Sequence, residues 1–316
     1  ADLGLSNTSV FIVLLAATGM LQAAEVWANT INLHFHFLLL ASLILALPAT
    51  GKKWAPLSLI LLTMCGLSGI PANFLAPLFI VFAILEKSRV RSMQALIITA
   101  TAALQIYLLS QSGYQQDRGL IPPLDIILFA SLTQSFFSLF WGFQGGNLSA
   151  NLLGPLLHPA LTLQTLAGSV FFIGSCLLIA KTYNLPNSLR HWEPDRRRNI
   201  KLILAALVSL AASITLAYGN KVDLISPTGG GRYFYAPNVL FVVLLVSLKG
   251  KPHLLRSFAM VSVVVFSLAK LPWAYKGGDW GVAIQLIDKR AKDDQILELS
   301  IWPTGWAMKL PTRCVN

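Results

Sequence analysis

Two short stretches at the ends of apolar segments hold most of the groups that could do chemistry. The first is Glu25-Val-Trp27-Ala-Asn29-Thr-Ile-Asn32, followed by Leu33 and His34. If this stretch is helical, Glu25, Asn29 and Asn32 share one face, because positions i, i+4 and i+7 align. A carboxylate beside two amides suits a hydroxyl-rich ligand or a phosphate-bound cation. The alternative interpretation is a hydrated helix end with Trp27 at a membrane interface.

The second stretch is Gly229-Gly230-Gly231-Arg232-Tyr233-Phe234-Tyr235. Glycines let backbone amides approach an anion closely, and the guanidinium of an arginine matches phosphate geometry. The helix expected to follow would direct its positive end to the same place. We therefore predict phosphate binding by Gly230, Gly231 and Arg232, with tyrosines nearby. The alternative is an arginine that reaches lipid headgroups beside an aromatic belt.

A third candidate is the segment 112–157, which contains the adjacent pair Asp117 and Arg118. Connections of more than about 15 residues are usually functional or disordered, so this segment is too long to be a simple connector. Asp117 is a candidate catalytic carboxylate. It could equally be half of a solvated ion pair.

Metal and cofactor chemistry find no support in the spacing of the usual ligands. His34 and His36 are two residues apart and would face opposite sides of a helix. Cys65, Cys176 and Cys314 are scattered without a CxxC pair. We predict no metal site, no disulfide framework and no soluble cofactor.

The elements that position these groups follow from composition. Of 316 residues, 55% are hydrophobic and 12% charged, and mean hydropathy is +0.65. Ordinary soluble domains carry about a quarter charged residues, which excludes a soluble enzyme. Apolar runs of helical membrane-spanning length predict an all-α polytopic membrane protein with about nine to ten transmembrane helices. The expected spans are 8–24, 33–49, 54–70, 72–86, 93–111, 158–181, 201–218, 234–249 and 257–275, with 124–143 as a span, a re-entrant hairpin or an interfacial helix.

Positive charge predicts the orientation, because Lys and Arg accumulate in cytoplasmic loops. Fourteen of the 24 basic residues lie in four loops: 52–53, 87–91, 181–201 and 249–256. We expect these loops on one side of a bacterial inner membrane, with the segment 112–157 and the tail 276–316 outside. The run Arg196-Arg197-Arg198 is then an orientation signal in contact with anionic headgroups. The net charge of +11 follows from this topology, so nucleic acid is not an expected partner.

Four regions result from these assignments. They are N-terminal transmembrane helices (1–111), an outer-face loop with a re-entrant or interfacial helix (112–157), C-terminal transmembrane helices (158–275) and a small outer tail (276–316). The tail contains a strand-like stretch, 296–302. The chain opens at Ala1 rather than Met, so we expect that an N-terminal part is missing.

Four short motifs together resemble uncharacterised bacterial polytopic membrane proteins with the layout of GT-C-type glycosyltransferases. They are the stretch 25–32, Gly66-Leu67-Ser68-Gly69, Gly230-Gly231-Arg232-Tyr233-Phe234 and Trp302-Pro303-Thr304-Gly305-Trp306-Ala307-Met308. This resemblance implies a polyprenyl-phosphate sugar donor, a site on the outer face, and inverting transfer assisted by an acidic residue of the first outer loop. Only Glu25 stands where that class has an acidic pair.

On this interpretation Glu25 is a general base and Arg232 holds the departing lipid phosphate. The residues expected to contact the sugar are Trp27, Asn29, Asn32, His34, Tyr233 and Tyr235.

Two other classes of function remain open from the sequence. One is a non-catalytic membrane subunit that binds a partner protein through 112–157 and 276–316. The other is a transporter or flippase for a lipid-linked substrate, which would require broken or charged segments near mid-span.

Overall fold

The computed structural model describes residues 6–19, 26, 32–49, 54–111, 129–153, 194–217, 231–247, 257, 260–265, 297–301 and 306–310. The chain divides into two compact units, Ala1–Leu271 and Pro272–Asn316.

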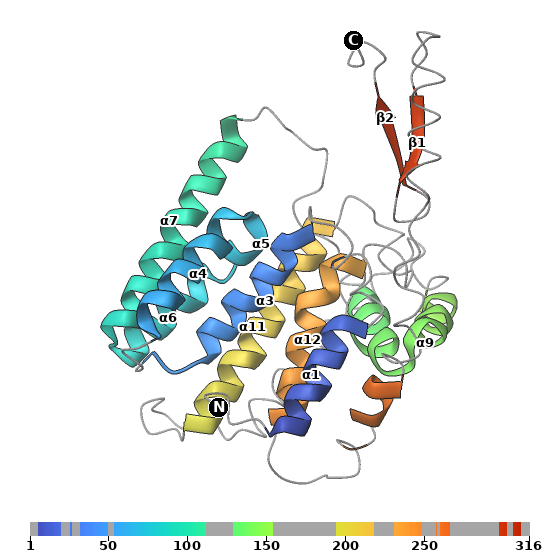
Figure 1. Cartoon of the computed structure of the whole chain (residues 1–316), viewed down its shortest axis with the longest axis horizontal. Coiled ribbons are helices and arrows are strands. Elements are labelled where there is room, and N and C mark those ends of the chain that lie inside the picture. The colour runs from blue at the N-terminus through green and yellow to red at the C-terminus, as the bar shows by residue number, and fades with distance from the viewer. Residues whose placement is uncertain are drawn as a thin grey trace, which may run out of the picture. The chain divides into compact units, whose positions relative to one another are not determined.

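Helices make up the first unit in the part of the chain described above (Figure 1). The all-α part of the predicted fold class is confirmed for these residues. The helices are α1 (Asn7–Gly19), α3 (Leu33–Ala46), α4 (Ala55–Leu67), α5 (Ile70–Asn73), α6 (Ala76–Glu86), α7 (Arg89–Gln111), the π-helix η2 (Ser131–Phe137), α9 (Ser138–Leu153), α11 (Pro194–Ala217) and α12 (Gly231–Ser247).

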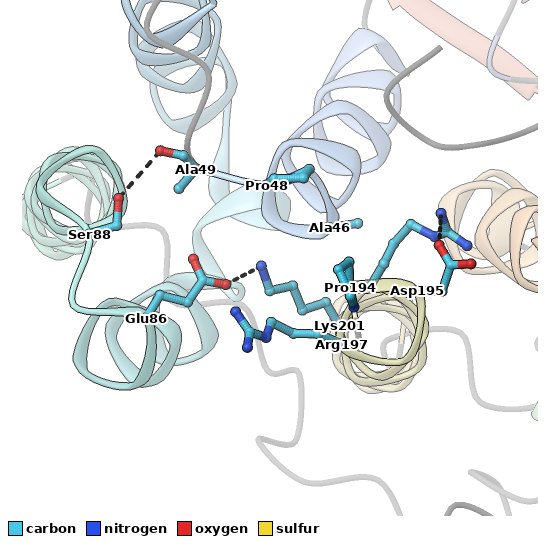
Figure 2. Close-up of a pocket in the computed structure, with 10 residues that line it drawn as sticks. Ala46, Pro48, Ala49, Glu86, Ser88, Pro194, Asp195, Arg197 and Lys201 are labelled. Carbon is cyan, nitrogen blue, oxygen red and sulfur yellow. Dashed lines mark hydrogen bonds and ion pairs between the residues drawn. The ribbon is translucent and has the colours of Figure 1, made fainter. Parts of the chain in front are cut away.

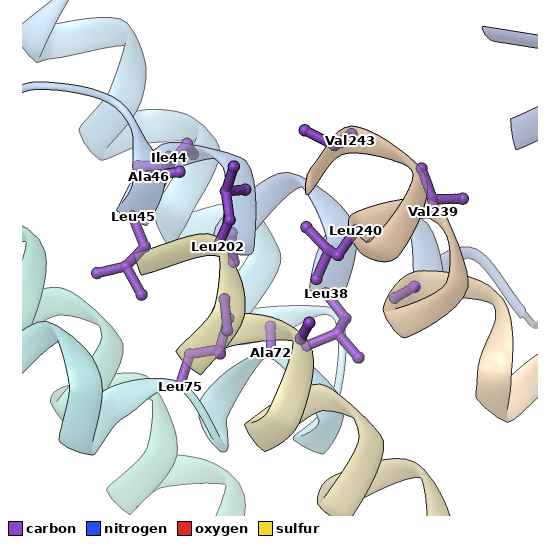
Figure 3. Close-up of a cluster of buried hydrophobic side chains, with 14 of the residues drawn as sticks. Leu38, Ile44, Leu45, Ala46, Ala72, Leu75, Leu202, Val239, Leu240 and Val243 are labelled. Atoms are coloured by element: carbon purple, nitrogen blue, oxygen red, sulfur yellow. The ribbon is translucent and has the colours of Figure 1, made fainter. Parts of the chain in front are cut away.

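The hydrophobic core lies where α3 packs against α11 and α12 (Figure 3). Leu38 and Leu45 of α3, Leu202 of α11 and Leu240 of α12 are almost completely buried there. Burying such a side chain away from water contributes about 1.5–3 kcal/mol, and here the buried side chains come from segments far apart in sequence. The core therefore fixes the relative positions of α3, α11 and α12.

A break between α4 and α5 turns the chain back on itself. The helices on the two sides of this break are bent by 118°. Gly69 lies at the break with φ 154°, a conformation that L side chains rarely adopt. Asn73 Nδ2 donates to the carbonyls of Gly66 and Gly69 at 2.9 and 3.1 Å. The Gly66 carbonyl is one of the acceptors that the end of α4 leaves without a helical partner, so Asn73 satisfies it and also ties the turn at Gly69.

Helix α7 is the one described helix that is long and apolar enough by itself to cross a membrane. Only 22% of its apolar window is buried, and Leu96 and Ile106 are 70% and 68% exposed. The bent pair Ala55–Leu67 and Ile70–Glu86 passes the same criterion only when taken together. Because α1, α3 and α12 are shorter, the predicted nine to ten spans are not confirmed.

The segment 129–153 forms a helical structure that doubles back. Thr133 and Ser149 hydroxyls lie 2.7 Å apart, and both side chains are buried. Sixteen residues of straight helix would separate them by about 24 Å, so η2 and the end of α9 lie side by side. A hairpin is one of the three forms that the sequence left open for 124–143. Its relation to a membrane stays a prediction.

Helices α7, α11 and α12 begin earlier than the apolar pattern predicts, and α12 begins at Gly231 rather than at residue 234. Helix α7 starts at Arg89 rather than at residue 93, and α11 starts at Pro194 rather than at residue 201. In α7 and α11 charged residues assigned to loops belong to the first turns of a helix. The expected span 158–181 and most of 257–275 lie outside the described residues.

The second unit contains an antiparallel hairpin of β1 (Leu297–Ile301) and β2 (Trp306–Leu310). Leu297 pairs with Leu310 and Ile301 pairs with Trp306. The expected strand at 296–302 is thus present as β1.

Candidate functional site

Two aromatic contacts join the first turns of α3 and α12. The ring centroids of Phe35 and Tyr233 lie 5.3 Å apart, edge to face, and those of His36 and Tyr235 lie 4.9 Å apart. Edge-to-face geometry of this kind is favourable beyond simple burial. Residues 232–235 of the second predicted stretch therefore lie against α3, the helix that directly follows the first predicted stretch, 25–32. We call Asn32, His34, Phe35, His36, Arg232, Tyr233 and Tyr235 the aromatic end.

Arg232 lies at the second residue of α12. Its guanidinium carbon is 5.1 Å from the centroid of the Tyr233 ring, within cation–π range. Helix α11 reaches the same place, because the Ser213 hydroxyl donates to the Tyr233 carbonyl. The amides of the first turn of α12 and the Arg232 charge together favour an anion at this end.

Asn32 and His34 border this group at the start of α3. Asn32 is buried directly before the helix, and the His34 ring lies 4.1 Å from the ring of Phe35. A Cβ placed on Gly69 would lie 3.5 Å from His34 Cβ, so the break between α4 and α5 reaches the same end of the bundle. Four short stretches of the chain, at residues 32–36, 69, 213 and 232–235, thus converge there.

The other predicted site residues lie outside the described residues. These are Glu25, Trp27, Asn29, Asp117 and Gly230. Gly231 is the first residue of α12, so this helix begins three residues before the expected span 234–249. The predicted face shared by Glu25, Asn29 and Asn32 is therefore described only at Asn32.

A buried ionic cluster, not predicted from the sequence, lies at the opposite end of α3. Glu86 Oε2 accepts from Arg91 Nε at 3.0 Å, and Lys201 Nζ contacts Glu86 Oε1. Arg91 is completely buried. The remaining nitrogens of its guanidinium donate to the carbonyls of Ile44, Leu45 and Leu47 at 3.3, 2.9 and 2.7 Å and to Gln94 Oε1 at 2.8 Å.

A cavity of about 410 Å³ lies beside this cluster (Figure 2). Lys201 and Arg197 extend from α11 toward Glu86 on α6, and Asp195 pairs with Arg198 at 3.1 Å. We call it the charged cavity, lined by Ala46, Pro48, Ala49, Glu86, Ser88, Pro194, Asp195, Arg197, Arg198 and Lys201.

One sequence signal could have indicated this cluster. The four basic loops contain fourteen basic residues, and the only carboxylates in them or directly beside them are Glu86, Glu193 and Asp195. A single carboxylate among many basic residues attracts several of them at once, so it is expected to pair with more than one. Glu86 is shared in this way by Arg91 and Lys201.

A third polar group joins η2 to α12. Asn238 Nδ2 donates to the Gln134 carbonyl at 2.9 Å, and both residues are completely buried. The π-helical form of η2 and Pro237 inside α12 both interrupt regular helix here. Such interruptions often accompany functional sites, but the group lies among packed side chains in the described part of the chain.

Neither a group of metal ligands among the described residues nor a similar known protein points to a further site. Among the described residues, no three His, Cys, Asp or Glu side chains are grouped so that they could hold a metal ion. Comparison with family models, curated proteins and solved structures finds no match to this chain. The aromatic end and the charged cavity are therefore the two candidate binding sites among the described residues.

Proposed function

We propose that the protein is an integral membrane glycosyltransferase that uses a polyprenyl-phosphate-linked sugar at its aromatic end. The observation that carries this proposal is the convergence of Arg232, the first turn of α12 and the rings of His36, Tyr233 and Tyr235 at one end of the bundle. A cation for the phosphate and aromatic or amide groups for the sugar are what such a donor requires.

The exposed surface of the bundle supports the membrane part of the proposal. Large apolar side chains are exposed on several helices, including Phe11 at 62%, Ile60 at 59%, Ile84 at 68% and Leu96 at 70%. A soluble protein rarely exposes so much apolar surface, whereas lipid tails cover it without cost. We propose about nine to ten transmembrane helices in a bacterial inner membrane, with the C-terminal tail outside.

The distribution of charge supports the orientation. The C-terminal end of α3 and the basic ends of α7 and α11 meet at the ionic cluster, while Arg232 lies at the other end of α3. The positive-inside rule then assigns the ionic cluster to the cytoplasmic side and the aromatic end to the outer side.

In the proposed reaction an acceptor hydroxyl oxygen attacks the anomeric carbon of the donor sugar. The bond between that carbon and the phosphate oxygen breaks, and polyprenyl phosphate leaves held by Arg232. Glu25 takes the hydroxyl proton as general base. The sugar is positioned by Trp27, Asn29, Asn32, His34, Tyr233 and Tyr235.

The test separates donor binding from transfer. Protein in phosphatidylcholine nanodiscs is titrated with undecaprenyl phosphate, and transfer is then assayed with a panel of undecaprenyl-phosphate hexoses. Arg232→Ala should weaken binding about tenfold or more, because a charge-assisted hydrogen bond contributes about 1.5–3 kcal/mol. Arg232→Lys should retain part of the affinity, and Glu25→Gln should abolish transfer while binding is kept.

Arg89→Ala is the matched control, since it removes an exposed arginine at the other end of the bundle. Equal undecaprenyl phosphate binding by wild type and Arg232→Ala would contradict the phosphate role. Binding without transfer to any acceptor in both wild type and Glu25→Gln would favour a non-catalytic subunit.

A further inference from the structure

The ionic cluster carries more positive charge than its own carboxylate balances. The side chains of Arg91, Lys201 and Glu86 are 0%, 2% and 10% exposed. One carboxylate is therefore shared by two buried cations. Two buried positive charges with a single counter-charge leave a net positive charge, which favours an additional anion nearby.

The charged cavity provides the place where such an anion would lie. Arg197 and Arg198 bring two more cations to its wall, and Asp195 brings one more carboxylate. If Arg91, which lies behind Glu86, is included, the described residues around the cavity provide four cations and two carboxylates. Helix α11 begins at Pro194 in the same wall, so the positive end of a 24-residue helix adds to the field.

An apolar cavity of about 630 Å³ adjoins the charged one. Pro48 and Ala49 line both cavities. The rest of the apolar wall comes from α3, α4 and α7 and includes Leu43, Leu61 and Trp54. A ligand that occupies both cavities must have a phosphate-sized anionic group joined to a hydrocarbon chain.

We propose that this end of the bundle binds an anionic phospholipid. Its phosphate lies in the charged cavity near Arg197 and Lys201, and an acyl chain lies in the apolar cavity across the Pro48–Ala49 turn. Basic pockets between helices on the cytoplasmic side of a membrane bind acidic headgroups in this way. The inference depends on the membrane part of the proposed function and is independent of glycosyl transfer at the aromatic end.

The test measures lipid selectivity with two neighbouring arginines. Delipidated protein in detergent is incubated with equal amounts of phosphatidylglycerol and phosphatidylcholine, and retained lipid is identified by native mass spectrometry. Arg197→Gln should reduce phosphatidylglycerol retention about fivefold, the effect expected for one cation near a headgroup. Arg196→Gln is the matched control, because it removes the same charge from the adjacent residue, which does not line the cavity.

Two further arms separate the explanations. Arg197→Lys keeps the charge and should keep selectivity, which distinguishes loss of charge from misfolding. Glycerol 3-phosphate, which has the phosphate without the chain, should not displace the lipid at matched concentration. The proposal is overturned by equal retention of the two lipids, by equal losses in Arg196→Gln and Arg197→Gln, or by displacement with glycerol 3-phosphate. If the protein does not sediment with the membrane fraction of cells, the proposed membrane location itself is contradicted.

Discussion

Arg91 is a completely buried arginine in the described part of the chain. Its guanidinium is completely buried, yet each of its nitrogens donates at least one hydrogen bond, to Glu86, Gln94 or the carbonyls that end α3. Those carbonyls are the acceptors that a helix end leaves without intrahelical partners. One side chain therefore satisfies the end of α3 and holds the start of α7 against it.

Removing this side chain should destabilise the protein strongly. We expect Arg91→Ala to cost about 3–5 kcal/mol, because it breaks a buried ion pair and leaves buried carbonyls without donors. The measurement is thermal unfolding in detergent. Arg89→Ala, an exposed arginine two residues earlier, should change stability by less than about 0.5 kcal/mol. Similar losses for both variants would contradict the role assigned to Arg91.

The sequence places Arg91 in a loop because charge interrupts the apolar pattern there. Arg91 can be buried because carbonyl oxygens at the end of α3 accept its hydrogen bonds. A hydropathy pattern does not show which carbonyl oxygens lie near a residue in space. Arg232 is the opposite case, since glycine spacing and an isolated arginine indicated its neighbourhood. Its contact with α3 through Tyr233 and Phe35 could not be predicted, because that contact depends on the packing of helices far apart in sequence.

At the scale of elements, α4 and α7 approach closely because Gly66 has no side chain. A Cβ at Gly66 would lie 2.7 Å from Thr101 Cβ, closer than real Cβ atoms approach. Thr101 in turn donates to Asn73 Oδ1 at 2.9 Å. Gly66, Asn73 and Thr101 thus connect the break after α4 to the middle of α7.

Substitution of Gly66 should reveal this contact. We expect Gly66→Ala to destabilise the protein by about 1–3 kcal/mol through overpacking. Thr101→Ala alone should cost about 1 kcal/mol through the lost hydrogen bond. If the methyl group added at residue 66 clashes with Thr101, the double variant should be more stable than the sum of the two single changes predicts. Unfolding in detergent measures the three free energies. Simple additivity would contradict the close approach.

The doubling back of 129–153 can be tested by cross-linking. In a background without the native cysteines, Thr133→Cys with Ser149→Cys should form a disulfide on mild oxidation, because the two side chains are in contact. Thr133→Cys with Leu148→Cys is the control, since Leu148 is 57% exposed on another side of the helix. Peptide mapping under non-reducing conditions measures the bond. Cross-linking in the control pair alone would exclude the described hairpin.

The presence of a helix was easier to predict from the sequence than the residues at which the helix begins and ends. The apolar runs at 33–49, 54–70 and 93–111 correspond to α3, α4 and α7, because continuous hydrophobicity is a strong local signal. The sequence did not predict the first turns of α11, because Asp195 to Asn199 are all polar. They are helical because Pro194 suits a helix start, Asp195 pairs with Arg198, and Lys201 reaches Glu86.

At the scale of the whole first unit, charge and apolar surface are separated along the helices. The ionic cluster is at one end of α3, the aromatic end is at the other, and exposed apolar side chains such as Leu96 lie on α7. The order of basic and apolar segments in the sequence predicted basic loops on one side, and this sidedness stays a prediction. The composition could not predict that α4 and α5–α6 form a bent pair, because the break at Gly69 is local.

Sided chemical labelling tests this arrangement in cells. Lys87→Cys should react with a membrane-impermeant maleimide only after the cytoplasmic side is opened. Leu96→Cys should react much more slowly from either side, because lipid excludes the reagent from the exposed face of α7. The readout is the labelled fraction against time. Rapid labelling of Leu96→Cys in intact membranes would indicate that water or a removable partner covers α7.

The shared carboxylate of Glu86 also has a consequence for the order of assembly. Arg91 and the carbonyls of α3 lie within the first 111 residues, so this part of the ionic cluster can form as soon as α7 is made. Lys201 follows 110 residues later, which at about 5–20 residues per second is a delay of about 5–20 s during synthesis. We therefore expect an early N-terminal intermediate in which Glu86 already pairs with Arg91. The arrival of α11 then completes the core and adds the second cation.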